Sequence, residues 1–199
     1  MSQDPYLYAD EVFEFRSSLT EETDRGCALM AAAYLADQLE RLLRRALVDD
    51  EDAVDELLRP LGPLGSFSGR IELCYALGLL PTDARRDLHL IRKIRNDFSH
   101  VAKTLTFDEP GITSRCRELN HSGREAEASP RAKFTSAVLA VCAVVHVFIQ
   151  TATQPDVPTG ITMTEEVKHK VREFADKLAL LVTQEFARSE DASSEQSDG

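Results

Sequence analysis

The chain has 199 residues, of which 43% are hydrophobic and 29% charged, a composition typical of a globular protein with a real core. Its 34 acidic residues outnumber its 23 basic ones, and the resulting net charge of −11 disfavours non-specific binding to a phosphate backbone. The four cysteines are far apart in the sequence and form no CxxC pair, so we expect free thiols in a cytoplasmic protein, and neither a metal site nor a cofactor.

Helical periodicity runs through most of the chain, and no segment has the pattern of a strand. The N-terminus lacks the features of a signal peptide, and the most apolar run, residues 137–149, is too short to span a bilayer, so it predicts a buried helix. In chain order the expected helices cover residues 10–19, 20–48, 49–58, 70–77, 82–103, 112–119, 131–151 and 164–188.

Helix-capping residues and chain breaks set these boundaries. Thr20 is the expected N-cap of the long second helix, and either Ser66 or Ser68 caps the fourth. The last helix carries an apolar seam whose spacing alternates between four and three residues, which favours a partner helix and a dimer. Residues 189–199 are rich in Ser, Glu and Asp, so we expect one domain over 1–188 followed by a disordered acidic tail.

The central helix, 82–103, separates into an apolar and a polar face. On a helical wheel, Leu88, Ile91, Ile94, Phe98 and Val101 share the sector that should face the core. A continuous polar arc follows at the edge of this sector. The polar arc consists of Arg92, Arg95, Asn96, Ser99, His100 and Lys103.

The polar arc combines groups that suit either binding or catalysis. A guanidinium can hold a phosphate or carboxylate through two hydrogen bonds, and an imidazole can transfer a proton near neutral pH. The alternative is a solvated helix face whose cations pair with acids and whose His100 contacts a neighbouring helix. The remaining histidines have no convincing partner set in the sequence, and His146 is expected to be a core residue with its polar atoms satisfied.

The segment RNDFSH, from Arg95 to His100, matches the R-x4-6-H pattern of the HEPN superfamily. A wider set of segments, from about residue 28 to residue 149, resembles the mannitol operon repressor (MtlR) family. These segments are PLGSFSGRI at 63–71, YALGL at 75–79, DLHLIRKIRNDFSH at 87–100 and SPRAKF at 129–134.

The MtlR resemblance implies a compact all-helical bundle of about six to eight helices and a role in regulating genes such as a sugar-alcohol uptake operon. No helix-turn-helix has a second helix basic enough to read a DNA groove, so we expect regulation through a protein partner rather than direct DNA binding. A homodimer is expected, RNA is a second conceivable partner, and no membrane association is expected.

The HEPN resemblance implies an alternative activity, a metal-independent ribonuclease or toxin. In that case Arg95 would stabilise the phosphate, Asn96 would orient the site, and His100 would transfer the proton of the ribose 2′-hydroxyl. Because the repressor-like context favours binding, the leading hypothesis is a regulator without enzymatic activity. The packing hypothesis is that the central helix contacts both the long helix 20–48 and the apolar helix 131–151.

Overall fold

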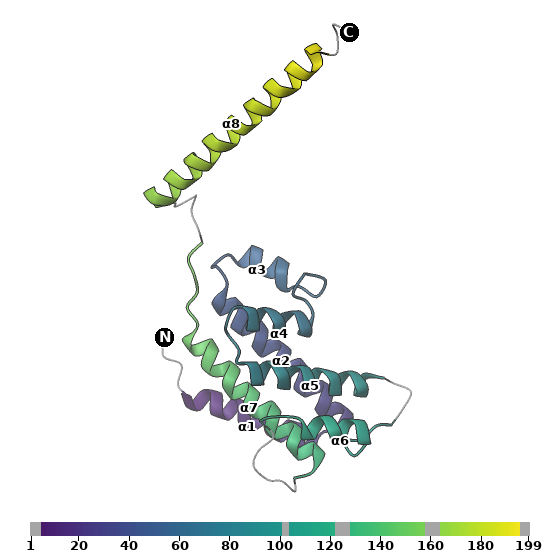
Figure 1. Ribbon diagram of the computed structural model, residues 1–199. Helices are drawn as coiled ribbons and strands as arrows, with labels where there is room; N and C mark the ends of the chain where they lie inside the picture. Colours follow the sequence, from purple (N-terminus) through teal and green to yellow (C-terminus); the bar gives the residue numbers. More distant parts are fainter. Residues whose placement is uncertain (1–4, 101–103, 122–127, 158–163, 196–199) are drawn as a thin grey trace. The chain divides into compact units, whose positions relative to one another are not determined.

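The computed structural model describes residues 5–100, 104–121, 128–157 and 164–195, with the backbone alone for 5–10 and 181–195. Within these residues the chain forms eight helices and no strand (Figure 1), which confirms the predicted all-helical fold. Chain contacts divide the protein into two units, Met1–Asp156 and Val157–Gly199. The first unit contains seven helices within its described residues. These are α1 (Pro5–Glu21), α2 (Asp24–Ala46), α3 (Glu51–Leu58), α4 (Phe67–Ala76), α5 (Thr82–Ser99), α6 (Pro110–Arg117) and α7 (Pro130–Thr151).

Helices α2, α5 and α7 form the centre of the first unit, where each contacts the other two (Figure 1). Their contact surfaces are fully buried apolar side chains such as Leu39 of α2, Ile91 of α5 and Val141 of α7. Helix α1 packs on α2 and α7, α4 on α2 and α5, and α6 on α5 and α7. The predicted packing of the central helix against the long and the apolar helices is therefore confirmed.

Helix α7 is long and apolar enough to cross a membrane when judged by length and composition alone. Its surroundings are those of a core helix, since it contacts α1, α2, α5 and α6. Phe134, Val138 and Val145 are completely buried in the hydrophobic cluster that these helices share. The hydrophobicity of α7 is thus explained by its central position.

The start of α2 differs from the prediction. Thr20 belongs to α1, where its hydroxyl donates to the Arg16 carbonyl at 2.9 Å. The N-cap is Thr23, whose side-chain oxygen accepts a hydrogen bond from the Gly26 amide at 3.0 Å. Both threonines precede acidic residues, and sequence alone did not show which of them interrupts the backbone.

Helix α4 begins and ends with two recognisable capping arrangements. Ser66, one of the two predicted caps, accepts a hydrogen bond from the Gly69 amide at 3.0 Å. At the other end Gly78 has φ +72°, and the following Leu79 amide donates to the Cys74 carbonyl at 2.8 Å. A residue with a side chain is strained at such a φ, so the glycine allows the chain to reverse towards α5.

Helix α5 is shorter than predicted. It ends at Ser99, and His100 is the C-cap with extended backbone angles of φ −72° and ψ 108°. The Ser99 hydroxyl donates to the Asn96 carbonyl at 2.7 Å, a local bond of the kind that competes with helix continuation. Leu88, Ile91, Ile94 and Phe98 are fully buried as predicted, whereas Val101 lies outside the described residues.

The second unit contains α8 (Glu165–Glu195). The Thr164 hydroxyl caps its start by accepting a hydrogen bond from the Val167 amide at 3.3 Å. The sequence placed the end of this helix at residue 188 and a tail at 189–199, but the backbone is helical to Glu195, and residues 196–199 lie outside the described residues. The two units defined by chain contacts meet after Asp156, whereas the sequence placed the end of the domain at residue 188.

Candidate functional site

The outer face of α5 carries the polar side chains that the wheel predicted. Arg92, Arg95 and Asn96 are half-buried, and Ser99 and His100 are exposed. The opposite face holds the fully buried Ile91, Ile94 and Phe98. Because three core residues anchor the inner face, the positions of Arg92, Arg95 and Asn96 along the outer face are determined by a well-packed helix.

Arg92 and Arg95 differ from most arginines of the first unit. Among the residues that the structure describes, neither forms an ion pair or a hydrogen bond, and the Arg92 Nε is buried without a partner. By contrast, eight other arginines of this unit pair with carboxylates. They are Arg41, Arg44, Arg59, Arg70, Arg85, Arg86, Arg115 and Arg131. In an acidic protein, two unpaired guanidinium groups about one turn apart leave a local surface suited to an anionic group.

The structure does not bring the whole polar arc together. No hydrogen bond joins the side chains of Arg95, Asn96 and His100 among the described residues. The Ser99 hydroxyl bonds to its own helix. His100 sits beyond the last helical residue, where its carbonyl accepts a hydrogen bond from Arg25 at 3.3 Å. Lys103 lies outside the described residues.

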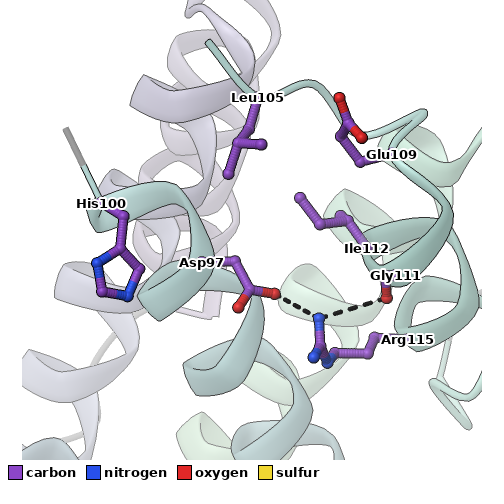
Figure 2. Close-up of a pocket in the computed structure, with 7 residues that line it drawn as sticks. All are labelled: Asp97, His100, Leu105, Glu109, Gly111, Ile112 and Arg115. Atoms are coloured by element: carbon purple, nitrogen blue, oxygen red, sulfur yellow. Dashed lines mark hydrogen bonds and ion pairs between the residues drawn. The ribbon is translucent and has the colours of Figure 1, made fainter. Parts of the chain in front are cut away.

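A cavity of about 370 Å³ lies beside the end of α5 (Figure 2). Figure 2 shows Asp97 between His100 and Arg115, while Leu105 and Ile112 supply apolar lining. The full lining consists of Asp97, His100, Leu105, Glu109, Gly111, Ile112 and Arg115. Of the predicted site residues that the structure describes, only His100 contributes to this cavity, and Arg92 and Arg95 lie outside its lining.

The ion pair between Asp97 and Arg115 is the main polar contact of the cavity. Arg115 comes from α6 and also donates to the Gly111 carbonyl at 3.3 Å. Asp97 is not among the residues of the predicted polar arc, and the sequence gave no partner for it. No local signal could have identified Arg115, because the two residues lie on different helices.

Two further histidine contacts were missed in the sequence. His121 Nδ1 lies 2.7 Å from Oδ2 of the fully buried Asp87, and His89 Nε2 lies 2.7 Å from Glu72 Oε1. The hydrogen bonds from Arg85 and His89 lower the pKa of the Glu72 carboxyl, in that order of size. Asp87 and Glu72 each join two chain segments, so these histidines have structural partners.

His146 and the cysteines lie in apolar surroundings. Partial burial lowers the pKa of His146, which is half-buried rather than fully enclosed. Burial raises the pKa of Cys27 to about 11 and that of Cys74, Cys116 and Cys142 to about 12. Thiols held in the protonated form are poor nucleophiles, and all four cysteines are free and buried, which suits a role in packing.

Comparisons with known proteins give a consistent result. The family model described as mannitol repressor matches residues 9–141. The mannitol operon repressors of Escherichia coli K12 and of Escherichia coli O6:H1 are each 27% identical over 103 residues, which is 50% of this chain and 53% of the relative. The chain thus matches about half the length of these curated relatives.

A solved structure has the same fold. It is described as the X-ray structure of the MtlR–HPr complex from Escherichia coli, and it superposes with a TM-score of 0.55 at 19% sequence identity. The match covers 66% of this chain and 98% of that chain. The likeness therefore extends over almost all of the solved chain, and it leaves about a third of the present chain unmatched.

Proposed function

Because the chain belongs to the mannitol repressor family, whose model matches most of the first unit, we propose that it is a cytoplasmic regulator of gene expression that acts through a protein partner. The regulated genes would include a sugar-alcohol uptake operon of the kind named in its relatives. The net charge of −11 supports a route through protein contact rather than through its own binding to operator DNA.

The partner docks on the outer face of α5. The observation that carries this proposal is that, within the described part of the chain, the guanidinium groups of Arg92 and Arg95 have no ion pair, on a helix whose other face is fully buried. Leaving the Arg92 Nε buried without a hydrogen bond costs stability, and a carboxylate or phosphate group of a partner would offset that cost. Asn96 and His100 would extend the contact towards the cavity at the end of α5.

HPr is the first partner to test, since MtlR is in complex with HPr in the solved structure of the same fold. The test is isothermal titration calorimetry of the purified full chain with purified HPr. We expect binding by the wild type and at least a roughly tenfold loss of affinity in the double variant Arg92→Ala/Arg95→Ala, which corresponds to about 1.4 kcal/mol. A double variant that binds HPr as tightly as the wild type would contradict docking on α5.

The double variant Arg45→Ala/Arg117→Ala is the matched control, because it removes the same two positive charges from exposed positions at the ends of α2 and α6. It should bind HPr like the wild type, which separates a specific contact from a change of overall charge. Loss of binding in this variant as well would argue for a purely electrostatic attraction. Specific operator binding by the purified chain at physiological salt, without a partner, would contradict the proposed route of regulation.

Ribonuclease activity is the second candidate function, and the observation that favours it is the intact motif with Arg95 on α5 and an exposed His100 at its end. This candidate predicts cleavage of RNA in the presence of a metal chelator. The cleavage should disappear in both Arg95→Ala and His100→Ala. If the wild type and both variants cleave RNA to the same low background extent, this activity is excluded.

A further inference from the structure

Helix α8 carries an apolar seam beyond the part of the chain that the family model matches. The model ends at residue 141, whereas α8 begins at Glu165. Val167, Val171, Phe174 and Leu178 follow one another at spacings of four, three and four residues. Their side chains are between 44% and 66% exposed, so the described residues of the second unit do not themselves cover this seam.

The spacing of the seam is that of a two-stranded coiled coil. Residues that alternate between three and four positions apart occupy the a and d positions of a heptad, and each inserts between four residues of the facing helix. With Val171 and Leu178 at a positions, Val167 and Phe174 occupy d positions. A second copy of the same helix offers the same spacing, so the seam is complementary to itself.

The charged residues beside the seam favour a second copy over an oppositely charged partner. Lys168 Nζ and Lys170 Nζ each lie 2.7 Å from a carboxylate of their own helix, Glu165 and Glu166 respectively. Lys177 likewise lies 3.8 Å from Glu173. Since each of these lysines already has an acidic partner on its own helix, they form no row of unpaired lysines that would select an acidic helix of another protein, although each keeps its positive charge.

The same charges distinguish the two orientations of a helix pair. In this heptad Lys170 and Lys177 occupy g positions and Ala175 occupies an e position. In a parallel pair, each g position faces the e position five residues further along the other helix, so Lys170 faces Ala175 of the partner subunit. In an antiparallel pair, g positions face each other, which places Lys170 near Lys177 of the partner subunit. Like charges at such positions are unfavourable, so the parallel arrangement is preferred.

We infer that α8 is a dimerisation helix that joins two copies of this chain through a short parallel coiled coil formed by Val167, Val171, Phe174 and Leu178. The dimer carries two copies of the family domain. A regulator of this form engages a partner at two docking faces, and this raises its apparent affinity for a multivalent target without any new contact. Because the seam is short, the association is weak and depends on protein concentration.

Sedimentation velocity of the full chain over a range of micromolar concentrations tests this inference. We expect the sedimentation coefficient to rise from that of a monomer to that of a dimer. Phe174→Glu should abolish the rise, because it buries a charge in the seam. Leu180→Glu is the matched control, since Leu180 is 58% exposed on the same helix but lies off the seam, and it should dimerise like the wild type.

A cysteine cross-link tests the orientation independently of stability. Val171→Cys should form a disulfide-linked dimer on mild oxidation, because a positions face each other in a parallel pair, and the native cysteines Cys27, Cys74, Cys116 and Cys142 are buried. Leu180→Cys should form much less disulfide-linked dimer. Monomer at every concentration, equal dimerisation of both Glu variants, or equal cross-linking of both Cys variants would overturn the inference.

Discussion

At the residue scale, Asp87 is a fully buried carboxylate with a structural task. Its two oxygens accept hydrogen bonds from the Asn120 amide at 2.9 Å and from the His121 amide at 3.0 Å, and Oδ2 also contacts the His121 ring. The segment that follows α6 is held to α5 by these bonds. A buried carboxylate is tolerated here because amide donors and an imidazole replace the water that it has lost.

We predict that Asp87→Ala lowers the free energy of unfolding by about 2–4 kcal/mol, because two amide groups lose their acceptor inside the protein. Asp83→Ala is the matched control, because Asp83 is exposed and its carboxylate is 3.5 Å from His121. This control should cost less than about 1 kcal/mol. Urea unfolding followed by circular dichroism measures both, and equal losses in the two variants would contradict the role given to Asp87.

At the scale of elements, Arg70 ties α4 to α2 and to the loop before α4. Its guanidinium donates to the carbonyls of Leu64, Ala36 and Leu58, each at 3.0 Å, and pairs with Glu40 at 2.8 Å. Three carbonyls and one carboxylate around a single side chain match the fork of donors that arginine provides. One residue therefore fixes how three chain segments meet.

We predict that Arg70→Lys destabilises the protein almost as strongly as Arg70→Ala, by about 2–3 kcal/mol, because an ammonium cannot reach three separated carbonyls. Arg59→Lys serves as the control, since Arg59 is exposed and pairs only with Glu56 of α3 through its side chain. It should leave stability within about 0.5 kcal/mol of the wild type. Thermal and urea unfolding measure these changes. If Arg70→Lys leaves stability unchanged, a positive charge at this position is sufficient and the geometry of the guanidinium is not required.

At the scale of the whole molecule, the hydrophobic core belongs to the first unit. Among the residues whose side chains the structure describes, every member of the buried cluster lies between Phe15 and Val145. A unit that contains its complete core has the main source of folding free energy within it.

We therefore predict that a fragment ending at Asp156 unfolds cooperatively in urea with the midpoint of the full chain. Each docking face of the fragment should also bind HPr with the same affinity as a docking face of the full chain. Ile91→Ala in the full chain is the sensitivity control, because removal of this fully buried side chain should cost about 2–5 kcal/mol. A fragment without a cooperative transition would contradict the assignment of the core.

The features that the sequence determined by itself are those that follow from local helical periodicity. The apolar spacing of Leu88, Ile91, Ile94 and Phe98 was enough to predict the buried face of α5, and the polar arc on its other side followed from the same geometry. The family resemblance was carried by ordered segments and agrees with the family model. Helix ends were predicted less well, as Thr20 and Thr23 show, because a cap depends on where the backbone actually turns.

Only the tertiary structure decided which groups meet between helices. Arg115 of α6 reaches Asp97 of α5, and His121, which follows α6, meets Asp87 of α5, so each pair joins two different elements. The structure also divided the polar arc. Among the described residues Arg92 and Arg95 lie on α5 without an ion pair, whereas His100 follows the end of the helix at Ser99 and lines the cavity. Contacts of this kind depend on how separate helices pack, and the spacing along one helix does not contain that information.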